Sequence, residues 1–415
     1  MSPTIMSASS SSTPWFILLL KTLDRRWFTQ MCHPHRLSIS LEEPLSHMSA
    51  AQECNEDTLR LIFEHCSYSS LAAAGRVCRA WALPAQQELF SVLPLRLHGT
   101  VQWDALGKIL LGSARLRSYV RKVQVFPCAA EDLEYYRWVP LLLHSGLLSL
   151  ELLAFPNDAL HAALGTMFLA SPEFSVLQRL IISGLALSNP AVLQRCLAMP
   201  SLQHLGIIFL PSFPDGLTSL TPSKTLSRLS IRTWDVPLDI SVLLRACGST
   251  LRRLDLALTH QPDLCGYARL RTALQGTPHL EHLYLDWTEA HPTPFLDGLV
   301  LPNMCHLRAG AGLYTGAFFA NLPPVLETLH LEYDRTHGAG ARLLTDNAAE
   351  QVYFPTEAAA TGLSAHPTLR LFTLSPNKYC PAMDFPALVT ASKSFRCKVA
   401  ILERAQAENS GLFWH

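Results

Sequence analysis

Arginine and histidine recur through the second half of the chain at a spacing of about 25 residues. The recurring positions are Arg179, His204, Arg228, Arg253, His282 and His306. Guanidinium and imidazole groups donate hydrogen bonds to carboxylates, so such a row is typical of a surface that binds an acidic partner segment. The same row could instead be a solvated face of mixed charge, if acidic side chains lie between the basic ones.

Each of these residues is the third in a short template, L-x-x-L-x-L, or in a close copy of it. The copies start at residues 147, 177, 202, 226, 251, 280, 304, 326 and 369. Recurrence at about 25 residues is the leucine-rich-repeat signature, with one strand and one helix or irregular turn in each unit. We therefore expect an α/β fold in which the second half is an irregular solenoid. The long gap before the last copy, which includes "TEAAATG", is expected to contain an insertion loop.

The geometry of a strand determines where the template's side chains point. Because they alternate, the fourth and sixth residues point into the core, and the third, fifth and seventh lie on the concave side. Neighbouring strands lie roughly 5 Å apart, so the cations of the row need acids between them. Asp255, Asp286 and Glu332 stand at fifth and seventh positions and could supply those acids. Interface cores favour Arg and Tyr. The candidate target-binding residues are Arg228, Arg232, Arg253, His282 and Tyr284.

Motifs that carry catalysis or bind cofactors are absent from the sequence. It contains no G-x-S-x-G, phosphate-binding loop, G-x-G-x-x-G or H-E-x-x-H. Cys32, His33 and His35 lie close together, but no fourth ligand stands at a usual spacing for a metal site. We therefore expect no catalytic residue, no cofactor and no metal. An enzyme that uses histidines of the concave face is a rival hypothesis, and the absence of paired acids or of a metal quartet argues against it.

The charge and cysteine content restrict the class of protein further. Lys plus Arg and Asp plus Glu both number 33, so the chain lacks the basic surplus that nucleic-acid binding needs. The 11 cysteines form no C-x-x-C pair, which favours reduced thiols in a cytoplasmic or nuclear protein. The opening apolar run, residues 15–20, is far too short to span a bilayer, and its flanks are not those of a signal peptide. Neither nucleic acid nor a membrane is an expected partner.

A segment of different character precedes the repeats. In residues 55–66 apolar side chains recur at i, i+3, i+4 and i+7, which predicts an amphipathic helix. A second helix is expected over 71–83, where Pro84 would end it shortly after Trp81. A third short helix is expected over 85–90. Three such short helices bury little surface by themselves, so we expect their apolar stripes to be shared with a partner.

This helical segment resembles an F-box, and "RVCRAW" is the most specific part of the match. The family pattern runs from an acid through Ile-Phe to a Leu, and closes on Val-Cys-x-x-Trp. The matching residues are Glu56, Ile62, Phe63, Leu71, Val77, Cys78 and Trp81. The family's opening Leu-Pro is missing, because Cys54 and Asn55 stand there. With its repeats, the whole chain resembles the F-box and leucine-rich-repeat proteins that are abundant in mushroom-forming fungi.

The resemblance implies a non-catalytic role in the ubiquitin pathway. Such proteins are substrate receptors of SCF-type, cullin-based ubiquitin ligases. Their F-box binds the Skp1 adaptor, and through it a cullin, while the repeats hold a target protein. The residues that would bind Skp1 or form the F-box core are Leu59, Ile62, Phe63, Leu71, Val77, Cys78 and Trp81. The alternative is a stand-alone leucine-rich-repeat scaffold without a ligase role, in which the helices merely cap the first repeat.

These elements divide the chain into five expected segments. Residues 1–50, rich in Ser and Pro, would form a disordered tail, and 51–95 the F-box-like domain. Residues 96–140 would form a linker or the N-terminal cap of the repeats. The solenoid would occupy 141–376, and 377–415 would form a C-terminal cap or tail.

Overall fold

The computed structural model of the 415-residue chain divides into two compact units, residues 1–148 and 149–415. The residues that the structure describes are 54–95, 100–125, 141–142, 146–152, 176–183, 189–208, 220–233, 240–258, 264–287, 294–333, 354–376, 385–393 and 395–402. The expected tail, 1–50, lies outside them, as does the cluster of Cys32, His33 and His35.

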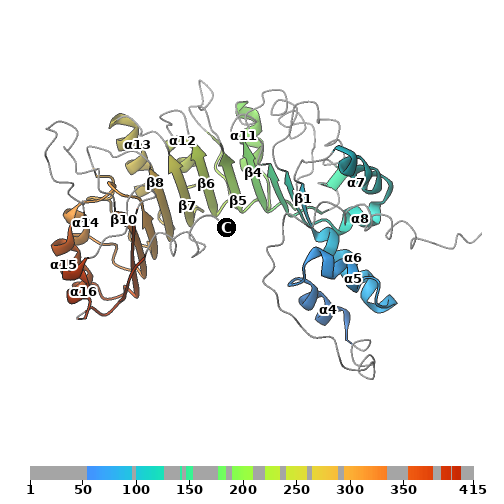
Figure 1. Ribbon diagram of the computed structural model, residues 1–415. Helices are drawn as coiled ribbons and strands as arrows, with labels where there is room; N and C mark the ends of the chain where they lie inside the picture. The colour runs from blue at the N-terminus through green and yellow to red at the C-terminus, as the bar shows by residue number, and fades with distance from the viewer. Residues whose placement is uncertain are drawn as a thin grey trace, which may run out of the picture. The chain divides into compact units, whose positions relative to one another are not determined.

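Three helices open the described part of the first unit (Figure 1). They are α4 (Glu56–Phe63), α5 (Tyr68–Ala74) and α6 (Arg79–Ser91). The side chain of Asn55 accepts a hydrogen bond from the Thr58 backbone N–H at 2.7 Å, which caps α4. Ser67 caps α5 in the same way, accepting from the Ser70 N–H at 3.2 Å. Each cap satisfies a backbone donor that the first turn of a helix leaves unpaired, and so determines where the helix begins.

The second helix is shorter than the sequence predicts. The stretch 71–83 does not form one helix, because α5 ends at Ala74 and Cys78 is extended, with φ −155° and ψ 170°. A new helix, α6, then begins at Arg79. Trp81 therefore lies in the first turn of α6 and not in the last turn of the helix before it.

The prediction that Pro84 ends a helix is wrong. Pro84 lies inside α6, and the helix expected over 85–90 is the continuation of α6. Proline removes a hydrogen bond from a helix interior, which is unfavourable. The residues around it offset that cost by burial, since Pro84, Ala85, Leu89 and Phe90 are all buried. Tertiary burial thus overrides the local preference of this residue.

The first unit also contains strands. Its remaining elements are β1 (Val92–Leu95), α7 (Thr100–Gly112), α8 (Ala114–Tyr119) and β2 (Lys122–Val125). β1 and β2 pair in parallel, with Val92 opposite Lys122. The range 96–140, expected to be a linker or cap, therefore contains α7, α8 and β2 in its described part.

The second unit is a solenoid whose described strands pair in parallel, each with the next one along the chain. The strands are β3 (Ser149–Leu152), β4 (Arg179–Ser183), β5 (His204–Ile208), β6 (Arg228–Thr233), β7 (Arg253–Leu258), β8 (His282–Trp287), β9 (His306–Ala309), β10 (Thr328–Tyr333), β11 (Leu371–Pro376) and β12 (Lys398–Ile401). The helices are α11 (Pro190–Leu197), α12 (Ser241–Cys247), α13 (Leu264–Gln275), α14 (Gly316–Ala320), α15 (Thr356–Ala365) and α16 (Pro386–Ser392). They lie on the convex side of the curved sheet (Figure 1). The expected α/β fold, with three helices followed by an irregular solenoid, is confirmed.

The core of this unit lies between the sheet and its helices. The template's fourth and sixth residues fill it, as in β7, where Leu254 and Leu256 have no exposed surface. Facing helices contribute Leu243 and Leu244 of α12, which are also fully buried. The third and fifth residues alternate with these and lie on the concave face, away from the helices.

Aromatic side chains join the leucines of the core at the far end of the solenoid. Tyr314 and Phe319 meet edge to face with their ring centroids 6.1 Å apart, and Phe354 contacts both. Within the gap expected to contain an insertion loop, the "TEAAATG" segment belongs to α15, and the preceding "THGAGARL" lies outside the described residues. Gly362 is required there, since a Cβ at this position would clash with the backbone carbonyl of Phe319. Close contact between α14 and α15 thus explains a glycine inside a helix.

Candidate functional site

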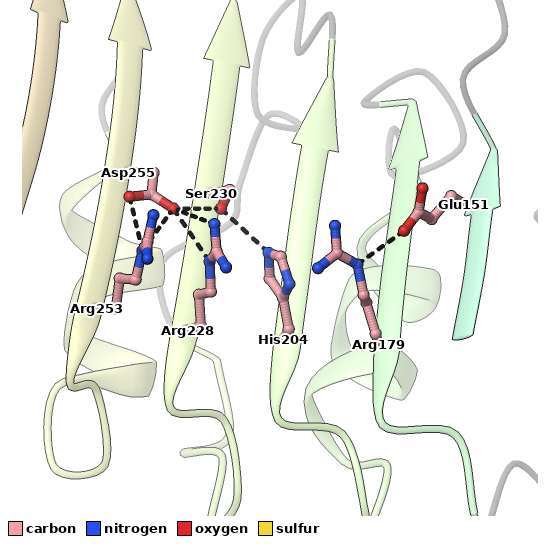
Figure 2. A network of polar contacts seen from close by, with 7 residues as sticks. All are labelled: Glu151, Arg179, His204, Arg228, Ser230, Arg253 and Asp255. Carbon is pink, nitrogen blue, oxygen red and sulfur yellow. Dashed lines mark hydrogen bonds and ion pairs between the residues drawn. The ribbon is translucent and has the colours of Figure 1, made fainter. Parts of the chain in front are cut away.

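The row of arginines and histidines predicted from the template is present, and Figure 2 shows four of its members, Arg179, His204, Arg228 and Arg253, on successive strands. Adjacent strands pair in register, so that the third template residues stand opposite one another. The order along the sheet is Arg179, His204, Arg228, Arg253, His282 and His306. The regular repeat spacing therefore predicted the register correctly.

Asp255 is the centre of a polar network in the middle of this row (Figure 2). Its Oδ2 accepts hydrogen bonds from Arg228 Nε at 3.1 Å and Arg228 Nη2 at 2.8 Å. Arg253 Nε donates to Oδ1 at 3.0 Å and to Oδ2 at 3.1 Å. Ser230 Oγ donates to Oδ2 at 3.1 Å. One carboxylate thus orients two guanidinium groups and a hydroxyl.

The burial of Asp255 makes these contacts necessary. The residue is 2% exposed, and a carboxylate so far from water is costly unless it is paired and hydrogen-bonded. Both arginines are more accessible, with side-chain exposures of 23% for Arg228 and 44% for Arg253. Burial lowers the pKa of Arg228, and the neighbouring Asp255 opposes that shift. The network is therefore anchored by a buried acid and is open to solvent on its basic side.

His204 extends the network to β5. Its Nε2 lies 3.1 Å from Ser230 Oγ. Because the Ser230 hydroxyl donates its proton to Asp255, its oxygen accepts from His204, which places the imidazole proton on Nε2. Burial, followed by Arg228, Arg179 and Arg253, lowers the pKa of His204 to about 3. The imidazole is therefore neutral at pH 7 and acts as a hydrogen-bond donor within the row.

The contacts of His204 do not have the order of a catalytic triad. In a triad the imidazole lies between the hydroxyl and the carboxylate, so that it can remove the hydroxyl proton. In this network the hydroxyl of Ser230 lies between His204 and Asp255. The arrangement positions donors and does not generate a nucleophile.

A second acid, Glu151 on β3, pairs with Arg179, the first member of the row. It was not among the acids predicted from the sequence. Arg179 Nε lies 2.9 Å from Glu151 Oε1, and the Glu151 side chain is only 5% exposed. The two groups form an ion pair by distance, without the alignment of a hydrogen bond. The signal was available, because Glu151 is the fifth residue of its template, as Asp255 is of its own.

The other end of the row is built from rings. His282 and His306 stack with centroids 4.3 Å apart and planes 14° from parallel. Burial, then the neighbouring His306 and Arg253, lowers the pKa of His282. Arg308 lies over the ring of Tyr284, 4.7 Å from its centroid, in a cation–π contact. This part of the face presents flat rings that stack on one another or lie under a guanidinium.

The three acids expected between the cations differ in the residues that they contact. Asp255 joins two members of the row, as described above. Glu332 instead pairs with Arg308, a fifth-position residue outside the row, at 2.9 Å. Asp286 lies beside Tyr284. Burial is the main cause that raises the pKa of the Tyr284 phenol, and the charge of Asp286 is the second.

The five candidate target-binding residues are not all brought together. Arg228 and Arg253 share Asp255, and Tyr284 stands opposite Asp255 in the β7–β8 register. His282 stands opposite Arg253. Arg232 lies further along β6, opposite Ile208 and Ala257. The assignment of these residues to target binding stays a prediction.

The helical unit divides its candidate residues into a core and a surface. Leu59, Phe63 and Leu71 are buried, at 2%, 2% and 3% exposed, within the unit itself. Trp81 packs edge to face on Phe63, with ring centroids 5.8 Å apart. Internal packing of this tryptophan was one of the two readings that the sequence left open. Cys78, at the N-cap of α6, is partly exposed.

Ile62 and Val77 are the exposed members of the set, at 50% and 52%. Leu61, which the sequence reading did not single out, is 64% exposed. Leu59 and Phe63 are four residues apart and lie on one stripe of α4. Ile62, three residues after Leu59, was expected in that stripe but lies at its edge and is half exposed. Leu61 lies off the stripe altogether. An apolar residue off the buried stripe was the signal that could have identified Leu61.

Within the described ranges, no group of three or more His, Cys, Asp or Glu side chains is arranged to hold a metal ion. The helices described here also include none that combines the length and the apolar character needed to cross a membrane.

Comparisons with known proteins give no family assignment. No protein-family model matches the chain, and no curated protein matches it either. Among solved structures, a yeast complex of Rad7 and Elc1 is similar at 17% sequence identity. The match covers 86% of this chain and 92% of that chain, with a TM-score of 0.41. At this TM-score and identity the likeness carries no argument about function.

Proposed function

We propose that this protein is the substrate-recognition subunit of an SCF-type ubiquitin ligase and is itself non-catalytic. Its helical unit binds a Skp1-like adaptor, and through it a cullin, while the repeats bind a target protein. The observation that carries the proposal is the exposure of Leu61, Ile62 and Val77 on a helical unit whose sequence resembles an F-box.

The exposed side chains support an adaptor-binding role because the unit does have a core of its own. Leu59 and Phe63 are buried, so Leu61 and Ile62 are not displaced core residues. Apolar side chains on an otherwise polar surface are common singly, but adjacent large ones typically mark a binding site. Burying one such side chain in an interface contributes about 1.5–3 kcal/mol.

The concave face of the repeats supports the target-binding half of the proposal. Its polar groups are held in place by one another, as Arg228 and Arg253 are by Asp255. Side chains that are ordered before binding lose less conformational entropy when a partner docks. A fixed row of donors therefore suits selective recognition of another protein.

Co-purification with a recombinant Skp1-like adaptor tests the first half. The full-length chain should retain the adaptor through size-exclusion chromatography. A double variant, Leu61→Ser with Ile62→Ser, should weaken adaptor binding at least about tenfold, because it removes two apolar contacts. Val300→Ser is the matched control, since Val300 is 67% exposed but lies in the second unit. That control should bind the adaptor as the unchanged chain does.

Two results would count against the proposal. One is failure of the unchanged, folded chain to bind any Skp1-like adaptor, which would leave the stand-alone scaffold as the function. Alternatively, the double variant could bind as tightly as the unchanged chain, which would remove α4 from the adaptor-binding surface.

A further inference from the structure

Two guanidinium groups share one carboxylate at the centre of the concave face. Asp255 engages Nε of both Arg228 and Arg253, together with Nη2 of Arg228. Arg179, two strands away, has an acid of its own in Glu151. His204, which stands between Arg179 and Arg228, is neutral at pH 7. The pair Arg228 and Arg253 therefore carries one positive charge that the acids it contacts do not balance.

The unbalanced charge is accessible. Asp255 contacts Nε and Nη2 of Arg228 but only Nε of Arg253, whereas Nη1 of Arg228 and the Nη groups of Arg253 have no acceptor among the described residues. Arg253 is 44% exposed and Arg228 is 23% exposed. Each guanidinium thus retains N–H donors that solvent or a docked partner can reach.

We propose that a Glu or Asp side chain of the bound target docks against Arg228 and Arg253, and completes an arrangement of two guanidiniums and two carboxylates. This inference rests on the proposal that the repeats bind a target, and it names the chemical group that they recognise. Asp255 is a positioning residue in this arrangement, because it holds both guanidiniums without touching the target.

The charge favours a carboxylate over a phosphate. The pair has a single positive charge in excess, which one carboxylate neutralises. A phosphate carries about −1.5 to −2 at pH 7 and would leave negative charge beside the buried Asp255. Guanidinium and carboxylate also match in planar geometry, which permits paired, charge-assisted hydrogen bonds.

The sequence offers a closely matched control for this site. Arg252 precedes Arg253, and it pairs with Glu281 at 2.5 Å. Its side chain is 62% exposed, which is more than the 44% of Arg253. Because side chains alternate along a strand, Arg252 does not belong to the row on the concave face. A nonspecific effect of losing one arginine would appear equally in both variants.

The probe is an immobilised array of random decapeptides. Each sequence is printed in three versions, which differ only in the central residue: Glu, Gln or phosphoserine. The purified full-length chain should bind the Glu series about five- to tenfold more strongly than the Gln series, as expected for a charge-assisted hydrogen bond. Arg253→Gln should reduce this ratio to about one, whereas Arg252→Gln should leave it unchanged. Arg253→Lys, which keeps the charge and loses the planar fork, should give an intermediate ratio.

Several outcomes would overturn the inference. Equal binding of the Glu and Gln series by the unchanged chain is one, and a preference for phosphoserine over Glu is another. Loss of the preference for Glu over Gln peptides in both Arg252→Gln and Arg253→Gln would show a nonspecific charge effect. Thermal unfolding of each variant excludes misfolding as the cause. The array contains no adaptor, so failure of adaptor binding with an intact Glu preference would remove the ligase role alone.

Discussion

The helical unit exposes large apolar side chains, whereas the repeat unit buries polar ones. In the helical unit, Leu61 and Ile62 are 64% and 50% exposed. In the repeat unit, Asp255 and His204 are 2% and 7% exposed. Exposed apolar residues and buried polar ones are the two departures from ordinary burial that carry information about function. Under the proposed function, the two units would bind their partners by different physical forces, apolar burial in one and fixed electrostatics in the other.

The difference follows from the geometry of the elements. A short helix such as α4 buries one stripe, and any apolar residue off that stripe faces solvent. In a parallel sheet, each side chain has neighbours on both adjacent strands at roughly 5 Å. Polar residues such as Asp255 can therefore be buried even on the face that lies away from the core.

The largest effect that separates the two units is expected from Phe63→Ala. Removing this buried ring should destabilise the helical unit by about 3–5 kcal/mol, while the solenoid keeps its fold. Trp81→Ala should cost less, because Trp81 is only partly buried against Phe63. Hydrogen exchange resolved by segment measures both. Equal loss of protection in β4–β8 would show that the units do not unfold independently.

Asp255→Asn should have the next largest effect, in the solenoid. The change removes the charge that two arginines share, and should cost about 1–3 kcal/mol, a value reduced because both arginines are partly exposed. Chemical denaturation gives the free energy of unfolding. Glu281→Gln is the control, since its ion pair with Arg252 is exposed and should contribute under about 1 kcal/mol. Similar costs for the two would contradict the central role of Asp255.

Stability should fall with acid through His204. Its pKa in the folded chain, about 3, lies below the ordinary value of 6.5, so the unfolded chain binds the proton first as the pH falls. The stability that neutral His204 contributes is therefore fully present above about pH 6.5. It is lost towards pH 3, at about 1.4 kcal/mol per pH unit. The free energy of unfolding of His204→Gln should therefore depend less steeply on pH than that of the unchanged chain, by the same slope. An unchanged slope would show that His204 titrates normally.

Leu61→Ser should have the smallest effect on stability, within about 0.5 kcal/mol, because the side chain is exposed. Adaptor binding, by contrast, should weaken. Urea unfolding alongside the adaptor titration separates the two effects. A large loss of stability would place Leu61 in the core of the unit and weaken the contrast drawn above.

Much of the repeat unit was predictable, because each prediction rested on many copies of one pattern. The template placed Leu254 and Leu256 in the core, and it aligned Arg228 with Arg253 before any contact was known. The helical unit was less predictable because its boundaries depend on single residues. Pro84 is tolerated inside α6 by burial that no local pattern reveals.

The amino-acid sequence by itself determined the periodicity, the alternation of core and surface, and hence which residues share the concave row. Only the tertiary structure decided how the charges of that row are paired. Asp255 joins Arg228 and Arg253, and Glu151 takes Arg179, although each acid could have faced several partners. The reason is physical: alternation depends on neighbours along the chain, whereas pairing depends on distances and burial set by strands that lie far apart in sequence.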